Sequence, residues 1–576
     1  MRGSTLTLAV VSWFLVGALP MAEAVSGGAI FTAVQNDDRA AVTTLLRQKM
    51  DVNAREEDGA TPLAWAAMRS NREIAALLLK AGANPNLTNE QGIGPLYIAI
   101  TNASTDIANL LLVNRADPNL AREDGETPLM TAALLGQVEV MRMLLDRGAE
   151  VNAREKRFGQ TALMWATGYP DAVRLLVQHG ADVHATSKSW DITATIYTPT
   201  TSTIGKTGIP WNNDGTYTNR QGGQNALLFA VQKHDLDSVR ILLDAGVDVN
   251  VAAADGTTAL LAALYKWDPL GKEFVGGKGA PAPAGSSARF GADLAIARFL
   301  LDRGAKVDVS DGAGYTPLHG AALAVAAITT LGRDRSAYGN GRATPAGTAR
   351  TVALPPELEG RLEEALDMVQ RLLDAGADPN RQTLYPTSGP VGDVRINPAP
   401  PGSSAFHIAA NSDCPPLVRM LAEKGANPNL LRKDGHTPFS VSVLSTDVAI
   451  VKEMVARGAN RTARYSPTDH FADPVKPISL PRREQTIAHI AAGAGAPDVL
   501  EYLSSIGVPL DGRNAEGETP LDLADHQERY REARAREGAE DKPDRMVTRD
   551  TTTTDAIKKL LGGRRTDTAI REEVGK

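Results

Sequence analysis

A repeat of 33 residues constrains the fold of this chain more than any other feature of its sequence. Four segments that each contain a pair of leucines are followed by Lys49, Gly82, Arg115 and Gly148, which lie 33 residues apart. The register continues, with mostly longer gaps, at Gly180, Gly246, Gly304, Gly376, Gly425, Gly458 and Gly507. Such a period is typical of a solenoid, in which each unit buries its apolar face only against its neighbours.

A second signature lies between these positions. Thr-Pro-Leu or Thr-Pro-Phe begins at Thr61, Thr127, Thr316, Thr437 and Thr519, and degenerate copies begin at Thr161, Asn225 and Thr258. Thr is a good N-cap, and Pro at the first helical position loses no hydrogen bond. The leucine pairs predict a second helix, and the glycine that follows predicts the left-handed conformation that ends it. Each unit is therefore expected to be a helix, a turn, a second helix and an extended finger.

These two elements resemble those of the ankyrin-repeat family, as residues 316–322 (TPLHGAA) and 372–380 (LLDAGADPN) show. The resemblance covers residues 28–561, or about twelve units. It implies an all-α solenoid whose fingers and inner helices form a concave surface that binds a protein. Lys49 and Arg115 depart from the helix-ending glycine. The tenth and eleventh units depart further, so we expect looser packing near residues 440–510.

The N-terminus predicts export. Arg2 precedes an uncharged apolar stretch at residues 6–19, and Ala22-Glu23-Ala24 then fits the small-residue rule for signal peptidase. We expect residues 1–24 to be a cleaved signal peptide, because the apolar stretch is shorter than the ~20 residues of a spanning helix. An uncleaved anchor is the alternative. The composition favours a bacterial source, which would make the protein periplasmic or secreted, with no membrane span after cleavage.

Net charge and cysteine content limit the partners. With a net charge of -7 the chain lacks the concentrated positive field on which nucleic-acid binding depends, so a protein partner is expected and nucleic acid is not. The single cysteine, Cys414, excludes an intramolecular disulfide and a cysteine-based zinc site, and we expect it to be a small core residue. The chain is expected to be monomeric.

Six stretches do not fit the period and are predicted to be insertions: residues 187–222, 267–290, 325–360, 381–402, 462–484 and 526–552. Loops of this length are typically functional or disordered. Residues 562–576 are predicted to be a disordered tail.

The first insertion has aromatic residues within a Thr-rich frame of β propensity, which predicts a finger extended into a hairpin. Trp190, Tyr197, Trp211 and Tyr217 are its candidate partner-binding residues, because Trp and Tyr are favoured as interface anchors. The alternative is that these aromatic residues pack on the flank of the solenoid and order the loop.

The sequence contains no catalytic constellation, and neither a cofactor nor a metal is expected. The repeat-period histidines, His319, His407 and His489, are predicted to form structural hydrogen bonds. Aspartates in the finger turns are predicted to serve turn geometry; they are Asp58, Asp124, Asp255, Asp311 and Asp434.

The leading prediction is an exported protein-interaction scaffold that is not an enzyme. One alternative is a secreted effector or toxin-neutralising protein. A remote alternative is a hydrolase with its site in the insertions, with Ser403 or Ser404 as nucleophile and His407 as base. Those serines lie where a helix begins, and Ser is a common N-cap, which favours a structural role.

Overall fold

The structure is a computed structural model that describes residues 28–199, 211–265, 286–331, 356–384, 402–412, 414–433, 435–466, 484–524, 555 and 559–560. The predicted signal peptide and tail lie outside these residues, as do large parts of the insertions. The chain forms two compact units. The N-terminal unit comprises residues 1–190 and 220–254, and the C-terminal unit comprises residues 191–219 and 255–576.

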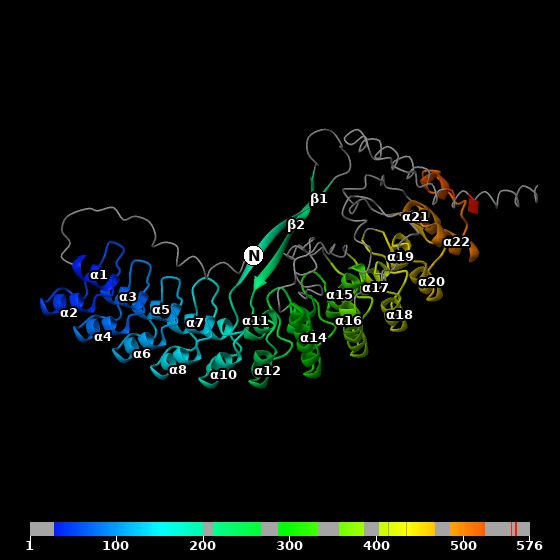
Figure 1. Ribbon diagram of the computed structural model, residues 1–576. Coiled ribbons are helices and arrows are strands. Elements are labelled where there is room, and N and C mark those ends of the chain that lie inside the picture. Colours follow the sequence, from blue (N-terminus) through cyan, green and yellow to red (C-terminus); the bar gives the residue numbers. More distant parts are fainter. Residues whose placement is uncertain are drawn as a thin grey trace, which may run out of the picture. The chain divides into compact units, whose positions relative to one another are not determined.

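Helices of the N-terminal unit come in pairs. They are α1 (Gly28–Gln35), α2 (Arg39–Arg47), α3 (Pro62–Met68), α4 (Arg72–Lys80), α5 (Pro95–Thr101), α6 (Thr105–Val113), α7 (Pro128–Leu134), α8 (Val138–Asp146), α9 (Ala162–Trp165), α10 (Pro170–Gln178), α11 (Ala226–Gln232) and α12 (Leu236–Asp244). Each odd-numbered first helix contacts the next one, and each even-numbered second helix does the same. Figure 1 shows these two rows, with fingers rising from the row of first helices.

The C-terminal unit repeats this pairing. Its helices are α13 (Ala259–Tyr265), α14 (Ser286–Asp302), α15 (Pro317–Leu331), α16 (Pro356–Asp374), α17 (Ala405–Ala410), α18 (Pro415–Glu423), α19 (Pro438–Leu444), α20 (Val448–Ala456), α21 (Ile487–Ala494) and α22 (Pro497–Ser505). The first helix α15 continues past residue 325, where an insertion is predicted, because Val325 and Ile328 remain buried. The helices confirm the predicted all-α solenoid fold.

Helix starts follow the chemistry of the second signature. The hydroxyl of Thr61 accepts a hydrogen bond from the Ala64 amide at 3.2 Å, and Thr127 caps α7 in the same way. At the helix ends, Lys49 (φ 60°) and Arg115 (φ 68°) adopt the left-handed conformation that glycine adopts elsewhere. The turn geometry of the repeat is therefore kept even where the glycine is missing.

Asparagine side chains join consecutive repeats. The Asn86 side-chain amide donates to the carbonyl oxygen of Arg115 at 3.1 Å, and its side-chain oxygen accepts from the Asp117 amide at 2.7 Å. The same pair of bonds is made by Asn53, Asn119, Asn152, Asn380 and Asn429. We call this arrangement the asparagine clamp. Each clamp satisfies a carbonyl that the end of the next helix would leave unpaired.

Two short sheets depart from the helical pattern. Strand β1 (Ser189–Pro199) pairs with β2 (Trp211–Gly222), so the first predicted insertion does contain paired strands. Strand β3 (Arg464–Tyr465) pairs antiparallel with β4 (Gln485–Thr486), with Arg464 opposite Thr486. Both sheets lie in finger positions, between a second helix and the next first helix.

The expectation of looser packing near residues 440–510 is wrong. Phe439, Ile450, Met454 and Ile487 are all 0% exposed, as fully buried as core residues elsewhere. The reason is that these units keep apolar residues at the inward positions although their motifs are degenerate. Helix α19 also begins with a capping box, in which Ser440 returns the hydrogen bond of its N-cap.

Candidate protein-interaction surface

A row of partly exposed aromatic side chains lies on the first helices of the N-terminal unit. Trp65 in α3, Trp165 in α9 and Phe229 in α11 occupy the same position, the fourth residue after the N-cap. Tyr97 in α5 lies one residue earlier in its helix. We call these four residues the aromatic row. All four are intermediate in burial, whereas the residues beside them in the helix are mostly buried.

Hydrogen bonds to the fingers orient the two indole rings. The Trp65 ring nitrogen donates to the Glu56 carboxylate at 2.6 Å, and that of Trp165 donates to the Gln160 side-chain oxygen at 2.7 Å. Burial raises the pKa of the Glu56 carboxyl, and the bond from Trp65 partly opposes this effect. The rings are thus held on the side of the helices that faces the fingers, as aromatic interface residues need.

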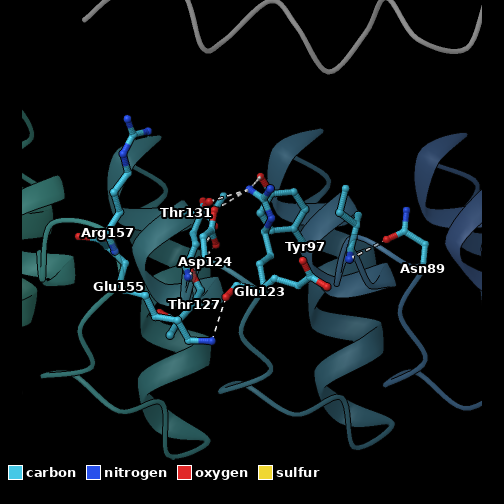
Figure 2. Close-up of polar contacts among 12 residues, drawn as sticks. Asn89, Tyr97, Glu123, Asp124, Thr127, Thr131, Glu155 and Arg157 are labelled. Carbon is cyan, nitrogen blue, oxygen red and sulfur yellow. Dashed lines mark hydrogen bonds and ion pairs between the residues drawn. The ribbon is translucent and has the colours of Figure 1, made fainter. Parts of the chain in front are cut away.

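An arginine-centred network links the third and fourth repeats. The Arg122 guanidinium donates to the Tyr97 hydroxyl at 3.2 Å and to the Glu126 carboxylate at 2.8 Å, and it lies 5.1 Å from the centre of the Tyr97 ring. Thr131 donates to the other oxygen of Glu126 at 2.8 Å. Figure 2 shows these contacts, which lie between Tyr97 and Thr131. Burial and the nearby Glu126 charge raise the pKa of Tyr97.

The fingers beside this row end in exposed carboxylates. Glu57, Asp58, Glu90, Glu123 and Asp124 are all exposed, and we call them the acidic finger tips. An open hollow of about 450 Å³ lies between two of these fingers and is lined by Gln91, Arg122, Glu123 and Asp124. Glu123 and Asp124 are shown near Tyr97 in Figure 2.

Backbone hydrogen bonds hold neighbouring fingers together. The Glu90 amide donates to the Asp58 carbonyl at 3.1 Å, and the Lys156 amide donates to the Asp124 carbonyl at 2.7 Å. Within their own turns, Asp58 and Asp124 accept from the amide two residues ahead. The predicted turn role of these aspartates is confirmed, as it is for Asp255 and Asp311; Asp434 lies outside the described residues.

Of the four candidate residues in the hairpin, the structure describes one side chain. The Trp190 ring packs against Phe158 of the preceding finger with ring centroids 5.6 Å apart. It also comes so near to Gly222 that a Cβ there would lie 2.7 Å from the ring. These contacts favour, for Trp190, the alternative in which it orders the loop. Tyr197, Trp211 and Tyr217 lie in β1 and β2, and their side chains are outside the described residues.

The predicted structural role of the histidines is confirmed. His319 accepts from the Thr316 amide at 3.2 Å, and its other ring nitrogen lies 3.1 Å from the Ser403 carbonyl of the next repeat. Burial lowers the pKa of His319 to about 4. His489 makes the corresponding contacts to Thr486 and Glu518.

The serine and histidine of the hydrolase alternative do meet, but as a helix cap. The Ser404 hydroxyl lies 2.9 Å from His407 in a capping box, and the two residues are 0% and 2% exposed. The burial of this pair favours its structural role as the cap of α17. Cys414 is also buried, as expected, and burial raises its thiol pKa.

Among the described residues, no cluster of three or more His, Cys, Asp or Glu side chains could hold a metal ion. Among the helices whose placement is described, none combines the length and apolar character needed to cross a membrane.

Comparison with known families agrees with this architecture. A profile described as "Ankyrin repeats (3 copies)" matches residues 30–122 and 96–187, and one described as "Ankyrin repeat" matches residues 222–254 and 402–433. The chain is 36% identical to mouse cyclin-dependent kinase 4 inhibitor B over 112 residues, which cover 19% of this chain and 72% of that protein. The chain belongs to the ankyrin-repeat family.

Other relatives are matched over smaller shares of their length. The chain is 28% identical to the mouse B-cell lymphoma 3 protein homolog over 37% of this chain and 49% of that protein. It is also 28% identical to a Caenorhabditis elegans transient receptor potential cation channel subfamily A member 1 homolog, over 21% of this chain and 9% of the channel. The chain therefore spans less than half of either relative. All three come from animals and give no support to a bacterial source.

Ankyrin repeats indicate a protein–protein interaction scaffold, in a family that is generally not enzymatic. The repeat motifs alone do not predict the aromatic row. A periodic signal did exist, since Trp65, Trp165 and Phe229 each lie four residues after a Thr or Asn that begins a first helix. This periodic signal is ambiguous because inward-facing and finger-facing positions of a short helix look alike in sequence.

Proposed function

We propose that the chain is an exported scaffold that binds a protein partner on the surface formed by the aromatic row and the neighbouring fingers. The observation that carries this proposal is the placement of four partly exposed aromatic residues on first helices of the N-terminal unit, in α3, α5, α9 and α11. Aromatic side chains bury a large area at a small entropic cost, and they dominate the binding energy of many interfaces. The hairpin of β1 and β2, with Tyr197, Trp211 and Tyr217, is the second candidate contact region.

Affinity purification from the envelope fraction and the medium tests this function. The intact chain is compared with Trp65→Ala and with a chain that lacks residues 187–221. We expect Trp65→Ala to weaken retention of the partner about tenfold, because a buried aromatic anchor contributes more than 1 kcal/mol. Tyr169→Ala is the matched control, since Tyr169 is an exposed aromatic outside the row (43% exposed).

Each result has a defined meaning. Loss of the partner with Trp65→Ala alone assigns binding to the repeats, and loss with the deletion alone assigns it to the hairpin. Equal retention by all variants would contradict binding on either surface.

Export is proposed from the N-terminal segment, with a periplasmic or extracellular location after cleavage following Ala24. Cell fractionation combined with N-terminal sequencing of the mature protein tests it. A chain that begins at Val25 outside the inner membrane is expected. A full-length chain in the cytoplasm would contradict export.

A further inference from the structure

We propose that the partner presents an extended, positively charged segment to the second, third and fourth repeats, with cationic side chains about three residues apart. This inference deepens the proposed function and rests on it. The surface consists of the acidic finger tips together with Trp65 and Tyr97 of the aromatic row.

The charge of the fingers is the first argument. Finger residues 55–60, 88–93 and 121–126 contain seven carboxylates and only two arginines. Both arginines already have partners inside the unit: Arg55 donates to the Thr88 carbonyl at 3.2 Å, and Arg122 donates to Tyr97 and Glu126. The excess negative charge therefore lies on the exposed finger tips, where it attracts and orients a cationic partner.

The next finger ends the acidic stretch. Lys156 and Arg157 occupy its tip, so the sign of the charge changes between the fourth and fifth repeats. The Lys156 ammonium donates to the Glu123 carbonyl at 2.9 Å, and the Arg157 guanidinium lies over the Phe158 ring at 4.8 Å. The acidic surface is thus limited to three consecutive fingers. Its length and its long axis are those of the row that these fingers form.

The spacing of the repeats favours an extended segment. Neighbouring packed helices lie about 8–10 Å apart. A chain extended as polyproline II rises about 3.1 Å per residue and completes a turn in three residues, so every third side chain returns to the same face and meets the next finger. A helix rises about 1.5 Å per residue and would need about six to seven residues for the same step. An extended segment of about seven residues in this conformation therefore reaches all three acidic fingers.

The hollow between the fingers supplies a place for one cationic head group. Its lining residues include Gln91, Glu123 and Asp124, and the last two are acidic. Arg122 shows that a guanidinium is accommodated over the Tyr97 ring beside it. The methylene stem of a lysine or arginine packs on aromatic rings while its charged end stays near carboxylates. The aromatic row and the finger tips thus serve the two ends of one type of side chain.

Binding of synthetic peptides, followed by fluorescence anisotropy with the full mature chain, tests the proposal. The probe is a peptide of about ten residues with lysine at every third position. Its controls are a peptide with the same lysines adjacent to one another and a peptide with glutamate in their place. We expect only the spaced lysine peptide to bind well, and its affinity to fall at least tenfold between ~50 mM and ~500 mM salt.

The decisive variant removes charge and keeps the turns. In Glu90→Gln/Glu123→Gln/Asp124→Asn, the Asn oxygen still accepts the Glu126 amide that Asp124 holds at 3.1 Å. We expect about fivefold weaker peptide binding. The control Asp106→Asn/Glu139→Gln/Asp146→Asn removes the same charge from exposed positions on α6 and α8, and should bind unchanged.

Three results would overturn the basic segment: no binding of the spaced peptide, equal binding of the glutamate peptide, or unchanged affinity in the finger variant. Self-association of the chain that the peptide does not displace would point to a second copy as occupant and would also overturn it. A native partner that is lost with Trp65→Ala but kept by the finger variant would leave the scaffold function standing without its basic segment.

Discussion

At the scale of single residues, the helix-ending turn shows how the repeat tolerates a wrong side chain. Gly82 and Gly148 adopt φ values of 95° and 85°, and Lys49 and Arg115 adopt 60° and 68° at the equivalent positions. A side chain in this region costs about 1–2 kcal/mol through contact of its Cβ with the backbone. Backbone hydrogen bonds hold the turn: the Met50 amide donates to the Leu45 carbonyl at 3.2 Å, and the Ala116 amide donates to the Leu111 carbonyl at 2.9 Å.

Replacing these two residues with glycine should stabilise the chain. For Lys49→Gly and Arg115→Gly we expect gains of about 0.5 kcal/mol each, since relief of Cβ strain exceeds the entropy cost of glycine. Urea denaturation measures the change. Gly82→Ala is the reverse control: its Cβ would meet nothing within 4 Å, so the expected loss of about 1 kcal/mol is purely a backbone effect. Unchanged free energies of unfolding in all three variants would contradict this account of strain in the helix-ending turn.

His319 makes stability depend on pH. Burial lowers its pKa to about 4, whereas an unfolded histidine titrates near its model value of 6.5. The unfolded chain therefore binds a proton first as the pH falls, and the folded state loses about 3 kcal/mol between pH 6.5 and pH 4. The contribution becomes constant about one pH unit above 6.5, where His319 is neutral in both states.

Urea midpoints measured from pH 7 to pH 4 test this effect. We expect His319→Gln to be less stable at pH 7 but to lack this part of the pH dependence. His184→Gln, at an exposed histidine, should keep the wild-type slope. Identical slopes in all three proteins would exclude His319 as the source.

At the scale of elements, the asparagine clamp decides how one repeat is fixed to the next. In the fourth repeat, the Asn119 amide donates to the Gly148 carbonyl at 2.9 Å and its oxygen accepts from the Glu150 amide at 2.7 Å. We expect Asn119→Ala to cost about 1–2 kcal/mol, because both bonds are lost. Asn119→Asp keeps the acceptor and should cost less.

Hydrogen exchange of the Glu150 amide separates the two variants. Protection of this amide should be lost in Asn119→Ala and retained in Asn119→Asp. Equal protection in both would show that the clamp is not what shields this amide.

The elements also show what sequence can predict. The starts of α3 and α7 can be predicted from Thr61 and Thr127, because the N-cap hydrogen bond is local and is formed with a residue three positions ahead. The clamp of Asn86 was not foreseen, since its partners Arg115 and Asp117 are about thirty residues away and become neighbours only when repeats stack. The bond from Trp65 to Glu56 joins residues only nine positions apart, but it forms only when the finger folds back against the helix that follows it. The degenerate motifs of α19–α22 wrongly suggest loose packing, because burial in the core depends on apolar volume rather than on the identity of the motif.

At the scale of the whole molecule, contacts of the first helices run from one repeat to the next within each of the two units. Damage should therefore spread only to neighbours. Leu129 in α7 is 1% exposed, and we expect Leu129→Ala to cost about 2–5 kcal/mol and to increase hydrogen exchange in α5 and α9. Exchange in α21 should not change. Uniform loss of protection throughout the chain would indicate global rather than nearest-neighbour cooperativity.

The asparagine clamp has a consequence for how such a chain can grow. Its donor and its acceptor both lie within each copied stretch, and each clamp reaches only the adjacent copy. Duplication of a 33-residue segment would thus copy both the donor and the acceptor groups of its asparagine clamp. Unequal recombination could therefore lengthen or shorten the array without requiring a new contact between repeats. Selection could then act on the residues of the fingers.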